Sequence, residues 1–497
     1  MKKDQIKKDE RKKILLITDD IRSHSGVGHI GREIIYNTCH KYNWVQIAGS
    51  INHPDQGKRL DLSSMIVEGS KVADASFISY PVKGYGTPSL ILEIIKKEKI
   101  EAIFLITDPR YFEWLFMMEN EIRKDIPIAY LNIWDDMPVP LYNSEFYESC
   151  DALFSINKQT KVINHLCLEN NKVSHKDMDS GINYFFGAGN RKTPILLKYI
   201  PHGLDEKTFY PIKGEDEEFE KFKSELFKGL EKNFVLLLNS RNIRRKSIPD
   251  ILGAWKEFTD SLPKEQQDKC LLICHTEPIS NEGTDLQATI EYLFSRDCNN
   301  VALSGGKLPP KYMNYLYNCS DGVILPSSAE GWGLSLTEAL LTATPFIATV
   351  TGGMQDQMGF KDNRGELYVN DKDVPSNHQK TYLNHGSWAY PIFPKSLSLV
   401  GSPQTPYIFD SRCDIKDILG AIKSLYNTQP FDRKLYGEEG MKWALKENIG
   451  FTSSRMGERV IEGMEELFKT WSPREKYEFY KDDEFKPRTL NHKLLYI

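Results

Sequence analysis

Short apolar runs alternate with amphipathic segments along most of the chain. This alternation is typical of parallel sheets whose strands are connected by helices. We predict an α/β protein made of two doubly wound, Rossmann-like domains that face a central cleft. The first half predicts strands at 12–18, 44–50, 102–108, 126–134 and 151–157, with a crossover helix at 90–100. The second half predicts strands at 233–240, 269–276, 300–306, 321–327 and 344–350 and helices at 248–260, 285–296, 309–318, 334–343 and 414–426.

A polar, charged stretch near 208–230 separates the two halves. Such a composition is typical of a boundary between domains. We therefore divide the chain into a basic tail at 1–11, an N-terminal domain at 12–210, a C-terminal domain at 211–449 and a tail at 471–497.

One segment interrupts the alternation. Residues 360–408 are rich in Pro, Gly and aromatic residues, and long ordered loops of this kind often cover a functional site. Trp388 in this insertion is a candidate to stack on a sugar or to anchor the loop. The last predicted helix, at about 450–470, is a candidate to cross back to the first domain.

The overall charge argues against a general affinity for polyanions. Lys and Arg number 64 and Asp and Glu 69, so nucleic acid is not favoured as a partner, although a local basic patch remains open. The first thirteen residues hold seven Lys or Arg against three acids, which fits a solvated tail and leaves peripheral membrane contact open. No apolar stretch approaches the roughly 20 residues of a membrane span. The eight cysteines form no CxxC pair, which favours a reducing, cytoplasmic compartment.

Three loops that follow predicted strands carry the candidate chemistry, because ligands of open parallel sheets sit at the carboxyl ends of the strands. The first loop contains Gly26, Gly28 and Gly31, where a phosphate can approach the backbone and the N-terminus of the next helix. An ordinary glycine turn explains the same residues. His29 in this loop is a candidate contact to phosphate or acceptor, or a histidine on a helix surface.

The second loop, after strand 233–240, contains Arg241 and Lys246. Fixed cationic donors of this kind stabilise the charge of a departing diphosphate. A solvated basic turn is the alternative, and we expect Arg244 and Arg245 to be the solvated pair.

The third loop places Glu330 and Glu338 on either side of a Gly-Trp-Gly turn. Both carboxylates can face one cleft and accept hydrogen bonds from sugar and ribose hydroxyls. Taken alone, the same pattern also fits a capping acid at Glu330 and an exposed helical Glu338.

Strand 126–134 leads into Trp134, Asp135 and Asp136, which we predict to face the donor across the cleft. Apolar stacking on the indole would orient an acceptor whose hydroxyls donate to the two acids. In the alternative interpretation the acids only cap the turn. An adjacent Asp pair also suits a metal ion, but we predict no metal in this protein.

The third loop resembles a signature of the retaining GT-B glycosyltransferases of family four, the glycosyl transferases group 1 type. The matching residues are Glu330-Gly331-Trp332-Gly333-Leu334-Ser335-Leu336-Thr337-Glu338, then Thr344-Pro345-Phe346-Ile347-Ala348 and Gly352-Gly353. Upstream, Ile200-Pro201-His202-Gly203-Leu204-Asp205 looks like the stretch that closes the first domain in this family. The resemblance covers roughly 12–358 and 408–465. It departs at 132–136, where the family often has a His-Asp group near the acceptor, and at Ala343, where Gly is common.

The resemblance implies roles for these residues. Arg241 and Lys246 would stabilise the departing diphosphate, Glu330 would contact the donor sugar, and Glu338 would bind the ribose. Further donor contacts would come from Gly26, Gly331, Trp332, Gly333 and Leu334. The implied reaction moves a sugar from a UDP- or GDP-linked donor to a hydroxyl acceptor, such as a glycan or lipid-linked glycan, with retention and without a cofactor or metal. The alternatives are an unusual acceptor such as a modified nucleic-acid base, a non-catalytic nucleotide- or glycan-binding protein of the same fold, and a nucleotide-sugar epimerase, which the signature disfavours.

Overall fold

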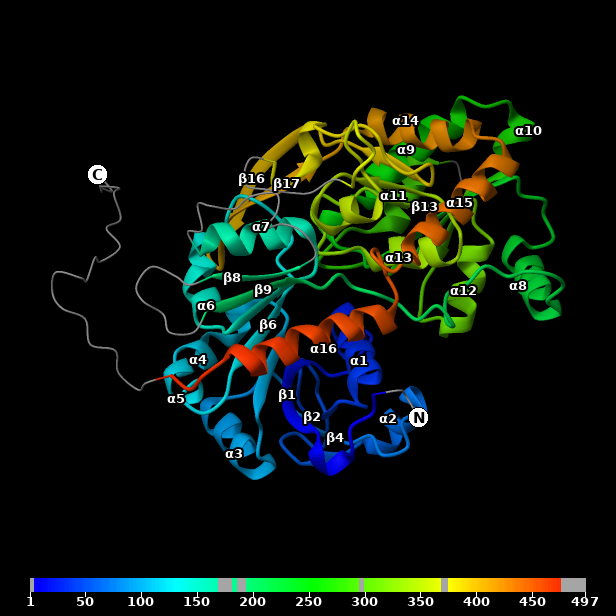
Figure 1. Ribbon diagram of the computed structural model, residues 1–497. Helices are drawn as coiled ribbons and strands as arrows, with labels where there is room; N and C mark the ends of the chain where they lie inside the picture. The colour runs from blue at the N-terminus through cyan, green and yellow to red at the C-terminus, as the bar shows by residue number, and fades with distance from the viewer. Residues whose placement is uncertain (1–3, 169–180, 186–193, 295–298, 368–373, 475–497) are drawn as a thin grey trace, which may run out of the picture.

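The computed structural model describes residues 4–168, 181–185, 194–294, 299–367 and 374–474, which form two α/β domains (Figure 1). Within these residues the first domain contains a nine-stranded sheet in the order β3-β4-β2-β1-β5-β6-β7-β9-β8. The two outermost strands, β3 and β8, run antiparallel to their neighbours, and the others are parallel. The strands are β1 Lys12–Asp19, β2 Tyr42–Gly49, β3 Leu60–Asp61, β4 Phe77–Pro81, β5 Ala102–Ile106, β6 Ile128–Asn132, β7 Ala152–Ser155, β8 Ile182–Phe185 and β9 Ile195–Tyr199.

Helices cover both faces of this sheet. The central strand β1 shows the consequence, because Ile14 and Leu16 belong to the core on one face and Leu15 and Ile17 to the core on the other. A strand that is buried on both faces is apolar at nearly every position, which is why the sequence pattern revealed it. The helices are α1 Gly26–Thr38, α2 Ser63–Ser70, α3 Pro88–Glu98, α4 Glu113–Phe116, α5 Glu119–Ile122, α6 Ser144–Glu148 and α7 Lys158–Cys167.

The second domain has a parallel sheet, six-stranded in the described residues, in the order β12-β11-β10-β13-β14-β15. The strands β11 and β12 lie on one side of β10, and the strands from β13 to β15 lie on its other side. The strand order therefore reverses between β10 and β13, and such a switch point places a crevice at the carboxyl ends of these two strands. The strands are β10 Phe234–Asn239, β11 Cys270–His275, β12 Val301–Ser304, β13 Gly322–Leu325, β14 Phe346–Thr349 and β15 Ala389–Ile392. The helices are α8 Glu217–Phe227, α9 Ile248–Asp260, α10 Lys264–Gln267, α11 Leu286–Leu293, α12 Pro310–Asn318, α13 Leu334–Leu341, α14 Ile415–Asn427 and α15 Pro430–Ala444.

Every strand and helix that the alternation predicted is present within a few residues of its predicted bounds, and only the last two residues of the predicted helix 285–296 lie outside the described residues. Among the elements that the pattern missed are β4, β9, β15 and α15. Helix α15 has no apolar stripe because its buried side includes Arg433, Gly437 and Gly440. A Cβ on Gly437 would lie 1.9 Å from the carbonyl oxygen of Ala343, so the helix packs there by close backbone approach instead of by large apolar side chains.

The C-terminal helix α16, Ser453–Thr470, lies against α1 of the first domain (Figure 1). Its Met456, Val460 and Met464 belong to the same core cluster as Ile14. The first domain therefore contains a segment from the end of the described chain, and two stretches of the chain connect the domains.

The segment 360–408 is ordered in its described part and contains β15, strand β16 Ser396–Ser402 and the first residues of β17 Thr405–Arg412; residues 368–373 lie outside the described chain. Strands β16 and β17 form an antiparallel hairpin. The hairpin reaches the first domain, where Phe409 N donates to Met137 O at 2.7 Å. Trp388 anchors the segment, because its ring packs on Trp443 and its Nε1 donates to the carbonyl oxygen of Gln357 at 3.0 Å.

Candidate active site

The carboxyl ends of β10, β11 and β13 carry buried polar groups that the fold leaves unsatisfied. In the described structure, Ser240 Oγ, Thr276 Oγ1 and Ser327 Oγ are buried without a hydrogen-bond partner. Buried polar atoms in native proteins are usually hydrogen-bonded. Three hydroxyls without a partner at the carboxyl ends of neighbouring strands therefore indicate a place for a polar ligand. They lie at the switch point, where α/β folds bind ligands.

A cluster of three charged side chains lies at these carboxyl ends. Lys246 Nζ contacts Glu330 Oε2, and Arg245 Nη1 lies 2.8 Å from the same oxygen. Burial alone would raise the pKa of Glu330, but Arg245 and Lys246 lower this pKa to about 2, so the carboxylate stays ionised. Burial lowers the pKa of Lys246, and Arg245 adds to this effect, while Glu330 opposes it. The predicted residues Lys246 and Glu330 are thus direct partners.

The structure exchanges the environments expected for two arginines. Arg241 is 68% exposed, and its Nη2 lies 2.8 Å from Glu282 Oε2, outside the cluster. Arg245, expected to be solvated, joins the cluster because the 3-10 turn Arg244–Lys246 presents it on the same side as Lys246. Arg244 is exposed, as expected. The role of Arg241 stays a prediction, and Arg245 is a site residue that the sequence analysis missed.

Glu338 has its own partners at the end of β10. Its Oε2 accepts from Asn239 Nδ2 at 3.0 Å and from the hydroxyl of Tyr317. Burial raises the pKa of Glu338, and these two hydrogen bonds oppose the rise. Glu330 and Glu338 therefore share one edge of the sheet but belong to separate hydrogen-bond groups.

The turn between the two glutamates depends on glycine. Gly333 has φ +84° immediately before α13, a conformation that side chains disfavour. A Cβ on Gly352 would lie 2.0 Å from Glu330 O, and Gly353 N donates to this oxygen at 3.1 Å. These contacts hold the Glu330 backbone against the loop that follows β14.

Trp332 in this turn does not have the environment predicted for a donor contact. Its ring is buried in the core of the second domain against Phe451, and its Nε1 donates to Thr337 Oγ1 at 2.8 Å. The ring and the single N–H donor of this indole already have partners within the protein. The indole therefore packs against the turn on its core side. Gly331 faces the first domain instead, where its carbonyl oxygen accepts from Asn157 Nδ2 at 2.7 Å.

The N-termini of α1 and α13 meet across the two domains. A Cβ on Gly26, the first residue of α1, would lie 3.6 Å from Cδ1 of Leu334, the first residue of α13. Gly28 is required by close packing, because a Cβ there would lie 2.4 Å from Ser23 Oγ. The first N–H groups of a helix have no partner within the helix, and they carry partial positive charge. Two such ends beside Lys246 form a setting for an anion with several phosphate oxygens.

His29 lies one turn into α1, with Nδ1 2.6 Å from Arg32 Nη2. Burial, together with Arg32, lowers the pKa of His29 to about 4. His202 on the neighbouring interdomain loop has a pKa of about 3, also through burial and then through His29. Any contact that His29 makes at neutral pH therefore involves an uncharged imidazole.

The loop after β6 brings its acids to the same region. Burial raises the pKa of Asp135, while Arg245 lowers it and Glu330 raises it further. Asp135 therefore interacts electrostatically with the charged cluster of the other domain. Asp136 is 3% exposed; its Oδ1 accepts from Met137 N at 2.8 Å, and its Oδ2 has no partner among the described residues. The two acids thus differ: Asp135 interacts electrostatically with Arg245 and Glu330, and Asp136 caps the turn.

Trp134 is 6% exposed and supports this turn from inside. Its Nε1 donates to Asp136 O at 2.9 Å, and its ring lies edge-on to Tyr142. The guanidinium of Arg110 lies 5.7 Å from the centre of the indole. An acceptor could stack on Trp134 only if these contacts opened, so the predicted stacking surface is covered in this structure.

The hairpin β16–β17 covers the same turn from the second domain. Tyr142 OH donates to Tyr407 O at 2.8 Å, and Arg110 Nη1 donates to Gln404 O at 2.7 Å. Arg110 is held in turn by Asp108, whose Oδ1 lies 2.7 Å from Nε. The sequence analysis missed these residues; the only signal was the unusual composition of 360–408.

Two searches gave negative results for the described part of the chain. These residues contain no group of three or more His, Cys, Asp or Glu side chains placed to hold a metal ion. Among the described helices, none is both long enough and apolar enough to span a membrane.

Comparisons with known proteins find sequence similarity in the second domain. Residues 212–374 match the sequence model of the family described as glycosyl transferases group 1. A D-inositol 3-phosphate glycosyltransferase of Corynebacterium jeikeium is 31% identical over 33% of this chain and 38% of its own length. An alpha-monoglucosyldiacylglycerol synthase of Acholeplasma laidlawii is 26% identical over 30% of this chain and 34% of its own length. The chain thus matches little more than a third of the length of these curated relatives.

Solved structures match nearly the whole chain at low identity. Anabaena HepE in complex with UDP and glucose has a TM-score of 0.59 at 12% identity and covers 92% of this chain and 100% of its own. A sucrose-phosphate synthase of Thermosynechococcus elongatus has a TM-score of 0.60 at 13% identity, with coverage of 92% and 100%. At this identity the likeness shows the fold. The chain thus has the two-domain GT-B fold, and its residues 212–374 are similar to the glycosyl transferases group 1 family.

Proposed function

We propose that this protein transfers a sugar from a nucleoside diphosphate sugar to a hydroxyl acceptor, with retention of the anomeric configuration. Two contacts at the switch point of the second sheet carry the proposal. Lys246 pairs with Glu330, which lies next to Gly333 at the N-terminus of α13, and the N-terminus of α1 approaches Leu334 at the same end of α13. Cations and helix N-termini suit a diphosphate, and a carboxylate suits the hydroxyls of a sugar.

In the proposed reaction, the bond between the anomeric carbon and the β-phosphate oxygen breaks, and the diphosphate leaves with the electron pair. Lys246, the helix ends and Arg241 stabilise its developing charge. The acceptor oxygen bonds to the same face of the anomeric carbon, and its proton passes to an oxygen of the leaving diphosphate. No side-chain base is needed for this route, which gives retention.

Glu330 and Glu338 take different parts of the donor in this proposal. Glu330 lies beside Lys246 and accepts from hydroxyls of the sugar. Glu338 lies at the end of β10 with Asn239 and accepts from the ribose, while the orphaned hydroxyls of Ser240 and Thr276 are satisfied by the same nucleotide. The two glutamates should therefore be separable by mutation.

The names of similar proteins suggest a donor to test first. HepE was solved with UDP and glucose, and a trehalose-6-phosphate protein of E. coli was solved with UDP-2-fluoro glucose, so UDP-glucose is the first donor to test. The two curated relatives are named for different acceptors, an inositol phosphate and a glycolipid, so neither carries over. A hydroxyl of a glycan or lipid-linked glycan is the acceptor class that we propose.

Thermal unfolding with UDP-, GDP- and ADP-glucose tests the donor site. One nucleotide sugar should raise the melting temperature in a concentration-dependent way, because it binds only the folded protein. Glu338→Ala should weaken the response to the free nucleotide, and Lys246→Met should weaken the response to the diphosphate. Arg244→Ala is the matched control and should respond like the parent. If no nucleotide sugar shifts the melting temperature and none is hydrolysed or transferred, the proposed function is wrong.

A further inference from the structure

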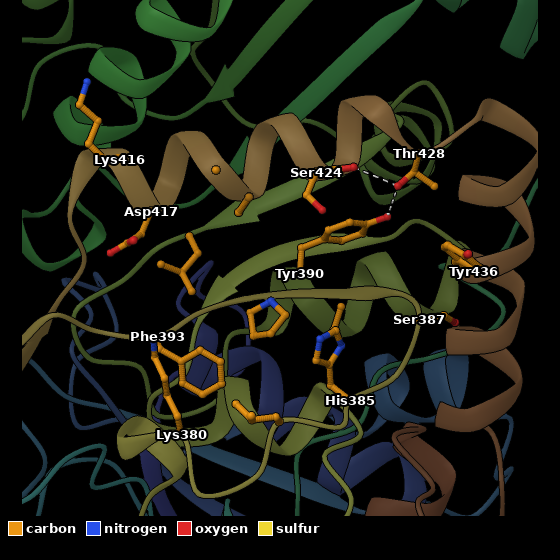
Figure 2. A pocket seen from close by; sticks show the side chains of 16 residues that line it. Lys380, His385, Ser387, Tyr390, Phe393, Lys416, Asp417, Ser424, Thr428 and Tyr436 are labelled. Atoms are coloured by element: carbon orange, nitrogen blue, oxygen red, sulfur yellow. Dashed lines mark hydrogen bonds between the residues drawn. The ribbon is translucent and has the colours of Figure 1, made fainter.

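A cavity of about 710 Å³ lies on the second domain outside the interdomain site. It is formed by α14, the strand β15 and the segment 380–387 (Figure 2). Strand β15 is at the edge of the sheet and is separated from β13, which carries the Glu330 loop, by β14. The cavity therefore needs an explanation separate from that of the donor cleft.

Helix α14 presents a distinct face to this cavity. Ile418, Ile422 and Leu425 are buried in the core, whereas the lining residues Asp417, Gly420, Ala421, Ser424 and Thr428 recur at helical spacing beside that face. A Cβ on Gly420 would meet nothing within 4 Å among the described residues. Glycine destabilises a helix interior, and no packing contact requires it here. Its effect is to leave room in the cavity.

An unsatisfied acceptor lies in the wall of the cavity. Asp417 Oδ2 is buried and has no hydrogen-bond partner in the described structure, while Oδ1 lies 3.4 Å from Lys395 Nζ. An orphaned carboxylate oxygen calls for a hydrogen-bond donor such as a hydroxyl group. The exposed hydroxyl of Ser424 lies two turns further along the same face of α14.

The cations around the cavity are already engaged or isolated. Lys416 Nζ pairs with Glu257 at 2.5 Å, and Figure 2 shows the Lys416 side chain at the N-terminal end of α14, directed away from the rings of Tyr390 and Phe393. Lys395 faces Asp417, and Lys380 lies 5.4 Å from the centre of the Phe393 ring. A polyanionic ligand would need a clear excess of cations, but the acids Glu257 and Asp417 accompany two of these three lysines. This arrangement favours an uncharged ligand.

The cavity also has aromatic walls and a blunted sheet edge. The rings of Tyr390, Phe393 and His385 stand beside the space below α14 (Figure 2). An added peptide strand would need N–H donors along β15, but Pro391 has none and Ala389 N already donates to Gly386 O at 3.1 Å. Partly exposed rings with scattered polar groups suit a ligand that has both apolar faces and hydroxyls.

We propose that this cavity is a second binding site, which takes a segment of a neutral oligosaccharide. The C–H faces of its sugars pack on Phe393 and Tyr390, and its hydroxyls donate to Asp417 and pair with Ser424. This site goes beyond the proposed transfer reaction and does not depend on it, because its residues lie outside the donor cleft.

Calorimetric titration of the full chain with maltotetraose, cellotetraose and chitotetraose tests the site. At least one of these neutral tetrasaccharides should bind. Gly420→Phe fills the cavity and should weaken that binding by about tenfold or more, and Asp417→Ala should weaken it in the same direction. Asn427→Phe adds the same ring at an exposed position of α14 that does not line the cavity, and it should bind like the parent.

Thermal unfolding with the nucleotide sugars checks that each variant is folded and keeps its donor site. If none of the three tetrasaccharides binds the parent protein, or if Gly420→Phe binds as tightly as the parent, the site is wrong. Glucose 1-phosphate serves as an anionic probe. If it binds the parent protein without competing with any of the three tetrasaccharides, and if Gly420→Phe abolishes this binding, the cavity takes an anion. The assignment to a neutral oligosaccharide is then overturned. Loss of the response to all nucleotide sugars with intact tetrasaccharide binding would contradict only the proposed transfer.

Discussion

Arg245 Nη1 lies 2.8 Å from Glu330 Oε2, the same carboxylate oxygen that Lys246 contacts. Burial raises the pKa of Asp135 in the opposite domain, and Arg245 opposes this rise. The arginine therefore stands between the proposed donor group and the proposed acceptor group. Its neighbour Arg244 belongs to the same turn but points to solvent, which provides a matched control.

Arg245→Ala should lower kcat for sugar transfer by about tenfold to a hundredfold, because a positioned charged donor acts mainly in the transition state. Arg245→Lys should restore part of the rate, since it keeps the charge but not the fork of donors. Steady-state kinetics of Arg245→Ala and Arg244→Ala check this. Equal rates for the two variants would show that Arg245 is only a surface partner of Glu330.

Arg241 must leave Glu282 if it is to reach the diphosphate. Both side chains of this pair are about two-thirds exposed, and exposed ion pairs contribute little to stability, so the release costs little. Glu282→Gln should therefore keep kcat within about twofold, whereas Arg241→Ala should lower it by about a hundredfold. Single-turnover transfer rates measure both effects. Normal transfer by Arg241→Ala would leave Arg241 as a solvated residue of the loop.

Asp135→Ala should reduce transfer to the true acceptor while donor affinity and slow donor hydrolysis persist. The reason is its place beside the charged cluster but on the first domain, where it can accept from an acceptor hydroxyl without touching the nucleotide. Product analysis that separates transferred sugar from hydrolysed sugar gives the answer. A variant that transfers normally would make Asp135 a turn residue and leave the acceptor site unlocated.

Asp356 should make stability depend on pH. Its Oδ2 accepts from Lys158 N and from Tyr199 OH of the first domain, each at 2.9 Å, and burial raises its pKa from 3.8 to about 6. Between about pH 4 and pH 6 the folded protein therefore binds more protons than the unfolded chain, so the free energy of unfolding falls as the pH rises through this window.

Asp356→Asn should flatten this dependence by an amount on the order of 3 kcal/mol over the window, since each pKa unit corresponds to about 1.4 kcal/mol. Denaturant unfolding of both proteins at about pH 4 and pH 7 isolates the effect, because every other titrating group is common to the two. The prediction fails if the parent and Asp356→Asn lose stability equally across this range.

The sequence by itself determined the central strands of both sheets and the motif that contains the two glutamates. Ile14 to Ile17 read as a strand because both faces of β1 are buried, and the order of apolar runs was enough to predict two doubly wound domains. Glu330 and Glu338 were identified because their spacing follows from one loop and one helix, which are local structures.

Only the tertiary structure decided which side chains use that scaffold. Arg241 and Arg245 have the same chemistry, and the turn geometry, which spacing does not encode, places Arg245 on Glu330. Trp332 lies in the signature and Trp134 lies in the predicted acceptor loop, yet packing buries both rings. The hairpin β16–β17 and helix α15 escaped the pattern because they are held by contacts with distant segments, such as Phe409 with Met137 and Gly437 with Ala343. Such contacts depend on how distant segments meet in the folded chain, and a linear pattern of apolar residues carries no record of that meeting.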